Sequence, residues 1–269
     1  TNPHDGLHVK STSVGLESEF KLGDGWKVSE KFRKSSNSGR FIALFPANNG
    51  DGASPITSTT FTATLFNTSI DDLGNMVNDL KVSKSFGDAA TGKTTLTAGL
   101  FSSEQNVALT WFWNQYTIDM KNSGAKATLA TTGWNTWGGC CVRSFDVQYT
   151  NTAPYAAATW ELGNLTLDGS IRRDEQRASG WAIQDDPVTQ TWDPATQQNV
   201  NYTVSHTSYS LGGNYQLNKD LALFARVSDG VSFSADRLLY GNPLDGSVPV
   251  ALNEVEQTEA GAKWRSGGF

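Results

Sequence analysis

The stretch His206-Thr-Ser-Tyr-Ser-Leu-Gly-Gly-Asn-Tyr215, followed after a short turn by Leu221-Ala-Leu-Phe-Ala-Arg-Val227, decides the fold class of this chain. Tyr209, Leu211 and Tyr215 occupy odd-numbered positions, and Ser210, Gly212 and Asn214 occupy the even-numbered positions between them. Because side chains of a β-strand point to opposite faces with a period of two, this pattern predicts a hairpin with one apolar and one polar face. A soluble sandwich and a barrel in lipid could both use such a hairpin.

The same alternation recurs along the chain, and it places Lys and Arg on the polar side. Trp26, Val28 and Phe32 alternate with Lys27, Ser29, Lys31 and Arg33, and Leu165, Leu167 and Ile171 alternate with Thr166, Asp168, Ser170 and Arg172. We expect Arg226, Lys263 and Arg265 on this polar side too. These cations are expected to line the wall of a barrel or to meet carboxylates inside it.

Connections of two very different lengths separate the expected strands. Tight turns rich in Gly, Asn and Asp fall at 22–25, 163–164 and 218–220, and such residues tolerate turn dihedrals. The segments 35–75, 104–151, 176–203 and 229–253 are far longer than the usual connection of about 4 to 6 residues. Short turns on one side and long loops on the other are typical of an outer-membrane barrel, so we expect an all-β antiparallel transmembrane β-barrel with short periplasmic turns and long extracellular loops.

Composition agrees with this fold and excludes one class of partner. The mean hydropathy is −0.40 and no run of 18 apolar residues occurs, so no transmembrane helix is expected. Only every second residue of a lipid-facing strand contacts lipid, which keeps the mean hydropathy of a barrel low. The nine Trp suit interfacial girdles, although sugar-binding proteins are also aromatic-rich. A net charge of −6 argues against a nucleic-acid partner, which would require a basic surface.

Two blocks of the sequence, 209–230 and 253–264, resemble the barrel domain of the TonB-dependent outer-membrane receptors. The resemblance implies a barrel of 22 strands around an N-terminal plug, in contact with the lipid of the bacterial outer membrane. It also implies capture of a small nutrient, such as an iron chelate, vitamin or oligosaccharide, with import energised by the TonB complex through the plug. We find no plug-like segment and about nine strands in this sequence, so we expect residues 1–269 to be a partial β-barrel domain of a longer receptor.

The segment Gly87-Asp-Ala-Ala-Thr-Gly-Lys-Thr94 matches the phosphate-binding pattern G-x-x-x-x-G-K-[ST]. That chemistry needs a buried strand before the loop and a helix after it. Residues 81–86 form a half-polar strand pattern, and residues 94–100 alternate on a β period. The sequence therefore favours a hairpin turn over a nucleotide site.

The sequence holds few other candidates for catalytic or metal-binding groups. His4, His8 and His206 are scattered, and neither a zinc-protease motif nor a serine elbow is present, so we expect neither an enzyme nor a cofactor. Cys140 and Cys141 are adjacent and could form a strained vicinal disulfide or a bridge to another segment. The acidic groups at 71–72 and 185–193 could in principle bind Ca²⁺ but lack a recognised loop spacing, and solvated acids are the simpler interpretation. No metal site is expected.

Segment 104–151 is the best candidate for ligand contact. It carries a high density of aromatic residues that could stack on a sugar, a chelator or a cation: Trp111, Trp113, Tyr116, Trp134 and Trp137, with Phe112 beside them. Arg143, Arg177 and Arg237, with Arg173, are expected on the same side and could pair with an anionic ligand. The alternative is that the rings pack the loop against itself or belong to the membrane-interface belt.

Two other functions remain open at this stage. A secreted soluble β-sandwich lectin could bind carbohydrate through the same Trp-rich segment, and it would be soluble without detergent. A passive porin would need no plug and would conduct ions steadily.

Overall fold

The computed structural model describes residues 6–45, 60–88, 90–119, 127–128, 142–186, 189, 191–233 and 252–265. The strands within these ranges are β1 (Gly6–Gly23), β2 (Trp26–Phe45), β3 (Thr60–Asp72), β4 (Asn75–Phe86), β5 (Lys93–Asp119), β6 (Ala127–Thr128), β7 (Arg143–Leu162), β8 (Leu165–Asp186), β9 (Thr191–Trp192), β10 (Gln198–Asn218), β11 (Leu221–Phe233) and β12 (Leu252–Trp264). A short 3-10 helix, η2, spans Pro194–Thr196. Within the described residues, no helix is long and apolar enough to span a bilayer.

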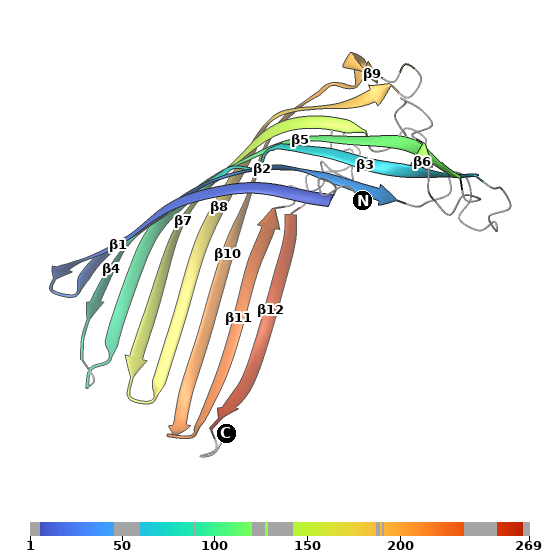
Figure 1. The fold of residues 1–269 in the computed structure, drawn as a ribbon. Helices are drawn as coiled ribbons and strands as arrows, with labels where there is room; N and C mark the ends of the chain where they lie inside the picture. Colours follow the sequence, from blue (N-terminus) through green and yellow to red (C-terminus); the bar gives the residue numbers. More distant parts are fainter. Residues whose placement is uncertain are drawn as a thin grey trace.

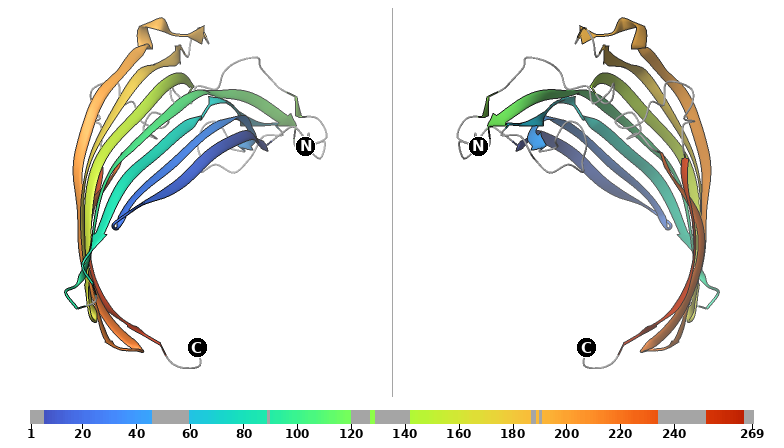
Figure 2. Two further views of the ribbon diagram at one scale, coloured as in Figure 1. Left: turned by 90° about the vertical axis from the view of Figure 1, so that its left-hand side faces the viewer. Right: turned by 90° about the vertical axis from the view of Figure 1, so that its right-hand side faces the viewer.

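One antiparallel sheet holds these strands in the order β1-β2-β3-β5-β7-β8-β10-β11-β12, with β4 also between β2 and β5. Figures 1 and 2 show long tilted strands in a strongly curved sheet, joined at one end by short turns. Nine strand positions therefore lie side by side in the described part of the chain, as the sequence predicted. The all-β antiparallel fold class is confirmed.

β3 and β4 occupy a single strand position that is interrupted at Leu73 and Gly74. Both strands pair with β2 on one side and with β5 on the other. Asp72 stabilises the interruption, because its carboxylate accepts from the Gly74 N–H at 2.6 Å and from Asn106 Nδ2 at 3.2 Å. Asn37 Nδ2 donates to the Leu73 carbonyl at 3.0 Å. Such a bulge bends a strand without ending its pairing.

The predicted tight turns are confirmed. β1 and β2 meet at Asp24 and Gly25, both with positive φ, and β10 turns into β11 where Asp220 N donates to Asn218 Oδ1 at 2.9 Å. The phosphate-loop pattern also forms a hairpin turn, between β4 and β5. Its Asp88 Oδ1 accepts the backbone N–H of Ala90 at 2.9 Å and that of Thr91 at 2.8 Å, so the carboxylate occupies amides that a phosphate would need.

Close to the short turns, large apolar side chains cover the outer face of the sheet. The register places them together on neighbouring strands with 41% to 61% of their surface exposed: Leu167, Ile171, Tyr209, Leu211, Tyr215, Leu223 and Val227. Trp26, Phe86 and Trp264 lie on this face nearest the turns and are exposed. A belt of exposed apolar side chains edged by aromatic rings is the surface that a barrel presents to lipid.

Further along the same strands, the apolar side chains change to the inner face. The register keeps Val147, Tyr149 and Val200 on the face that carries Arg172 and Asp168 nearer the turns. All three are at most 4% exposed. The outward positions beside them, such as Gln148, are exposed and polar. Beyond the membrane belt the outer face meets water, so the apolar residues pack inward.

This change of face corrects the boundaries expected for the long segments. Much of 35–75, 104–151 and 176–203 is strand rather than loop, and β11 and β12 extend into the two ends of 229–253. β5, for example, continues to Asp119, and β10 starts at Gln198. Apolar and polar residues still alternate in these parts, but the apolar residues now face inward. The alternation therefore does not continue in phase with the pattern that defined the hairpins.

Candidate functional site

We call the part of the sheet beyond the apolar belt the upper sheet. Four aromatic side chains gather on its inner face and form the inner aromatic group: Phe41, Phe66, Trp111 and Trp113. Phe66 and Trp113 are Cα partners on β3 and β5, with ring centroids 4.9 Å apart and planes at 80°. Trp111 lies two residues from Trp113 on the same face, with a centroid separation of 6.3 Å. Phe41 on β2 extends the row, 6.3 Å from Phe66 and nearly parallel to it. Edge-to-face and offset contacts of this kind stabilise aromatic pairs.

Two apolar clusters continue this surface across β7, β8 and β10. Leu109, Phe145 and Ala182 form one, and Val147, Tyr149, Ala178 and Val200 form the other, with Val107 packed against both. Tyr202 packs beside the second cluster. Burial raises the pKa of Tyr202, and the Tyr149 hydroxyl opposes that rise. Leu109 lies two residues before Trp111 on the same face of β5, so the first cluster adjoins the inner aromatic group.

Arg143 places a cation beside the aromatic rings. It begins β7 as the Cα partner of Trp111 and is 9% exposed. A guanidinium in an apolar setting offers planar, directional hydrogen bonds to a carboxylate or phenolate. Among the residues that the structure describes, the upper inner face therefore combines aromatic rings with the guanidinium of Arg143, an arrangement suited to stacking and charge pairing.

The structure brings together only part of the set expected from sequence. Trp111, Trp113 and Arg143 meet on the inner face. Arg177 instead lies on the outer face of β8, 68% exposed at its side chain, with Nη2 2.7 Å from Glu175 Oε1. The expectation that Arg177 joins the rings is thus corrected, because an odd-numbered position on β8 points outward. Arg173 is also outward and donates to Thr207 and Ser205.

Several expected residues lie outside the described part of the chain. These are Trp134, Trp137, Cys140, Cys141 and Arg237. The backbone of Tyr116 belongs to β5, but its side chain is likewise outside the description.

Sequence reasoning missed Phe41 and Phe66 as part of the inner aromatic group, and Tyr149 and Tyr202 as part of the second apolar cluster and its edge. Each occupies an inward position of a strand that was expected to be a loop at that point. The signal that could have found them is the reversed alternation: in Asn199-Val200-Asn201-Tyr202-Thr203, the apolar residues take the even positions that are polar lower on the strand.

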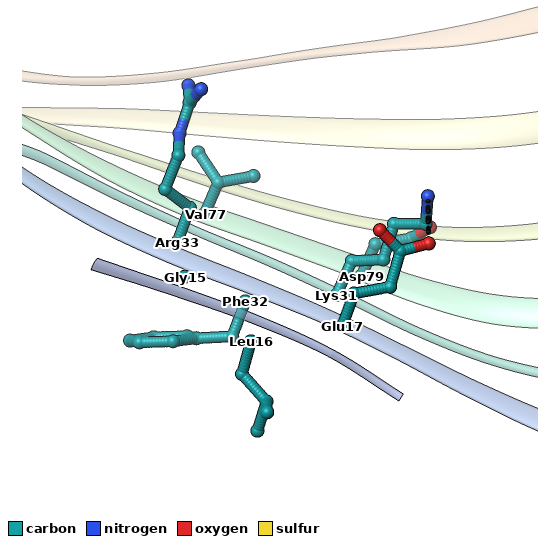
Figure 3. Close-up of a pocket in the computed structure, with 8 residues that line it drawn as sticks. All are labelled: Gly15, Leu16, Glu17, Lys31, Phe32, Arg33, Val77 and Asp79. Carbon is teal, nitrogen blue, oxygen red and sulfur yellow. Dashed lines mark ion pairs between the residues drawn. The ribbon is translucent and has the colours of Figure 1, made fainter. Parts of the chain in front are cut away.

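Closer to the short turns, at the level of the apolar belt, the inner face of the sheet carries paired acidic and basic side chains. Figure 3 shows Lys31, Glu17 and Asp79 pointing to the same side as Arg33, whereas Phe32 and Leu16 point to the other. Lys31 Nζ lies 2.7 Å from Glu17 Oε1. These residues, with Gly15 and Val77, border a hollow of about 520 Å³.

A second hollow of about 290 Å³ continues the wall over β4, β5, β7 and β8. Tyr155 donates its hydroxyl proton to Asp79 Oδ1 at 2.8 Å. The Arg172 guanidinium lies 4.6 Å from the centroid of the Phe101 ring and also donates two hydrogen bonds to Asp174, at 2.9 and 2.8 Å. Polar inner walls of this kind meet water or another polar surface rather than lipid.

The family model "TonB dependent receptor-like, beta-barrel" matches residues 1–269. The chain belongs to this family. The barrel of a TonB-dependent receptor sits in the bacterial outer membrane and is not enzymatic, so the apolar belt is the lipid-facing surface, and the inner aromatic group lies beyond it, away from the short turns. The soluble lectin is excluded by this assignment. No curated protein matches the sequence.

Two solved structures of such receptors share the fold of this TonB-dependent receptor barrel. The ferric yersiniabactin uptake receptor FyuA from Yersinia pestis is 14% identical with a TM-score of 0.57, and the match covers 97% of this chain and 34% of that one. The ferric citrate transporter FecA in the unliganded form is 14% identical with a TM-score of 0.54, covering 96% of this chain and 32% of that one. The present chain spans about a third of the length of each.

Proposed function

We propose that this chain is the ligand-capturing barrel wall of an outer-membrane receptor that imports a small nutrient with energy from the TonB complex. An iron chelate is the preferred cargo, with a vitamin or an oligosaccharide as the other members of the proposed class. The observation that supports capture is the inner aromatic group, because it packs four aromatic rings against one another on the inner face beyond the membrane belt.

The composition of this surface favours an iron chelate over the other cargoes. Trp111 is only partly buried and offers a ring face to a planar chelator, whereas Trp113 and Arg143, at 8% and 9% exposed, would support that face from beneath and set its charge. The two similar solved structures are named for ferric complexes, which agrees with this preference.

The charged inner wall supports the second half of the proposal, coupling through a plug. Glu17, Lys31, Asp79 and Arg172, on β1, β2, β4 and β8, form a polar surface at membrane depth. A plug domain of the complete receptor would meet this surface by charge pairing, and the TonB complex would act on that plug. Residues 1–269 are then a partial barrel of a longer receptor.

Binding by the full-length receptor in detergent tests capture. Titration calorimetry with ferric phenolate, ferric catecholate, ferric citrate, cobalamin and maltodextrin should give tight binding to one iron chelate. Trp113→Ala should weaken it about tenfold, equal to about 1.4 kcal/mol. Arg143→Ala should weaken an anionic chelate similarly. Arg177→Ala is the matched control, because Arg177 faces outward and should leave affinity unchanged.

Two results would overturn the capture proposal. One is an absence of binding to every compound in the panel by a folded receptor. The other is an unchanged affinity in both Trp113→Ala and Arg143→Ala. Energised import is tested separately in cells: deleting TonB should abolish uptake of the bound compound while leaving its surface binding intact.

A further inference from the structure

One histidine lies where the upper sheet divides between β10 and β11. The ladder between these strands ends at Tyr209 and Asp229. Above it, β10 continues to Gln198 beside β8, whereas β11 continues to Phe233 beside β12. Figure 1 shows β10 rising well above the upper ends of β11 and β12. Side-chain contacts at this division therefore influence how closely the two parts stay together.

His206 on β10 makes such contacts with both departing strands. Its Nε2 lies 2.6 Å from Asp229 Oδ1 on β11, and its Nδ1 lies 3.4 Å from Glu254 Oε1 on β12. The side chains of His206 and Asp229 are each 13% exposed, and that of Glu254 is 58% exposed. One imidazole thus bridges carboxylates from two other strands.

The charged groups that face His206 from β8 are Asp174 and Arg172. Asp174 is the Cα partner of His206. Its carboxylate accepts two hydrogen bonds from Arg172 and a third from Asn151 at 2.9 Å. Because Arg172 already balances Asp174, the remaining negative charge around the imidazole comes from Asp229 and Glu254.

The protonation state of His206 decides how many of these contacts can form. A neutral imidazole has one N–H, so it can donate to one carboxylate while its other nitrogen turns a lone pair toward the second. An imidazolium donates from both nitrogens and carries the opposite charge. Histidine is the side chain that changes charge between about pH 5 and 8.

We propose that His206 is a pH-dependent clamp that holds the upper ends of β11 and β12 against β10 when protonated and releases Glu254 when neutral. The clamp needs no ligand and is independent of nutrient capture. It lies four positions below Tyr202 on the same face of β10, so opening it loosens the sheet next to the second apolar cluster.

Distances between spin labels on the full-length receptor test the clamp. Labels at Thr203→Cys and Ser232→Cys, both exposed, span the division, in a background with Cys140 and Cys141 changed to serine. The distance should be short and narrowly distributed at pH 5.5, and longer and broader at pH 8. His206→Gln should give the broad distribution at both pH values. His8→Gln, which removes a histidine far from the division, should behave like the parent.

Glu254→Gln provides a second variant should His206→Gln fail to assemble, because Glu254 is largely exposed. It keeps the imidazole but removes the second carboxylate, so the pH response should be reduced or lost. The proposal is overturned if the parent gives the same distribution at both pH values, or if the pH response persists in His206→Gln and Glu254→Gln.

Discussion

The ring of Tyr155 on β7 covers Gly99, its Cα partner on β5. A Cβ at position 99 would lie 2.3 Å from Tyr155 Cζ, so only glycine leaves space for the ring. By crossing β5 in this way, the Tyr155 hydroxyl reaches Asp79 on β4. One side chain thus links strands that are not neighbours in the sheet.

Gly99→Ala should therefore displace the Tyr155 ring and break its hydrogen bond to Asp79. Overpacking of this kind costs about 1 to 3 kcal/mol, and urea unfolding of the receptor in detergent should show it. Gly230→Ala is the matched control, because no atom lies within 4 Å of a Cβ built there. Equal stabilities of the two variants would show that the ring contact contributes little.

Leu211→Arg tests which face meets lipid. Leu211 is 61% exposed on the outer face of β10, and an Arg on the lipid face costs about 2 to 4 kcal/mol at the bilayer midplane. We expect a clear loss of folding free energy in lipid vesicles. Thr203→Arg, outward on the same strand but above the belt, should cost less than about 1 kcal/mol. The assignment fails if both variants are equally stable.

Arg226 and Asp168 form a bridge across β10, in which Nη2 lies 2.8 Å from both carboxylate oxygens. Gly212 on β10 leaves room for it, because a Cβ there would lie 2.7 Å from Nη2. Each side chain is about a third exposed, so we expect a coupling energy of only about 0.5 to 1 kcal/mol. A double-mutant cycle of Arg226→Ala and Asp168→Ala measures it, and additive effects would argue against the bridge.

The turn at Asp88 should make stability depend on acidity. Hydrogen bonds from the backbone N–H and the hydroxyl of Thr91 hold the pKa of Asp88 below its usual value of 3.8. A carboxylate with a lowered folded-state pKa stabilises the fold above its unfolded pKa, and that contribution is lost as pH falls through the folded value. Asp88→Ala should thus be less stable than the parent at pH 7, with the difference shrinking below about pH 4. A difference that stays constant down to pH 2 would contradict this.

The lower half of the fold was predictable because its signals are local. The hairpin at Tyr209 and Leu223, the tight turns and the nine strand positions all follow from alternation and turn residues within short windows. The turn interpretation of the phosphate-loop pattern was likewise decided by its flanking β period.

The upper half required information that a single strand does not contain. Val200 and Tyr202 face inward because lipid is absent at their height, and no local pattern states where the membrane ends. The partnership of Phe66 with Trp113 depends on the register between β3 and β5. Arg143 and Arg177 share a charge and a predicted side, but their strand positions place them on opposite faces.

Because the apolar side chains change face along each strand, substitutions in the upper and lower parts of one strand act on different surfaces. In β5, substitutions at Trp111 or Trp113 alter the inner aromatic group without touching Leu96 or Leu100 on the lipid-facing side. An insertion of a single residue between Leu100 and Leu109 would instead turn every later side chain of β5 to the other face. An insertion of two residues would restore the faces. Point substitutions and even-numbered length changes in the upper strands are therefore expected to preserve which side chains face inward.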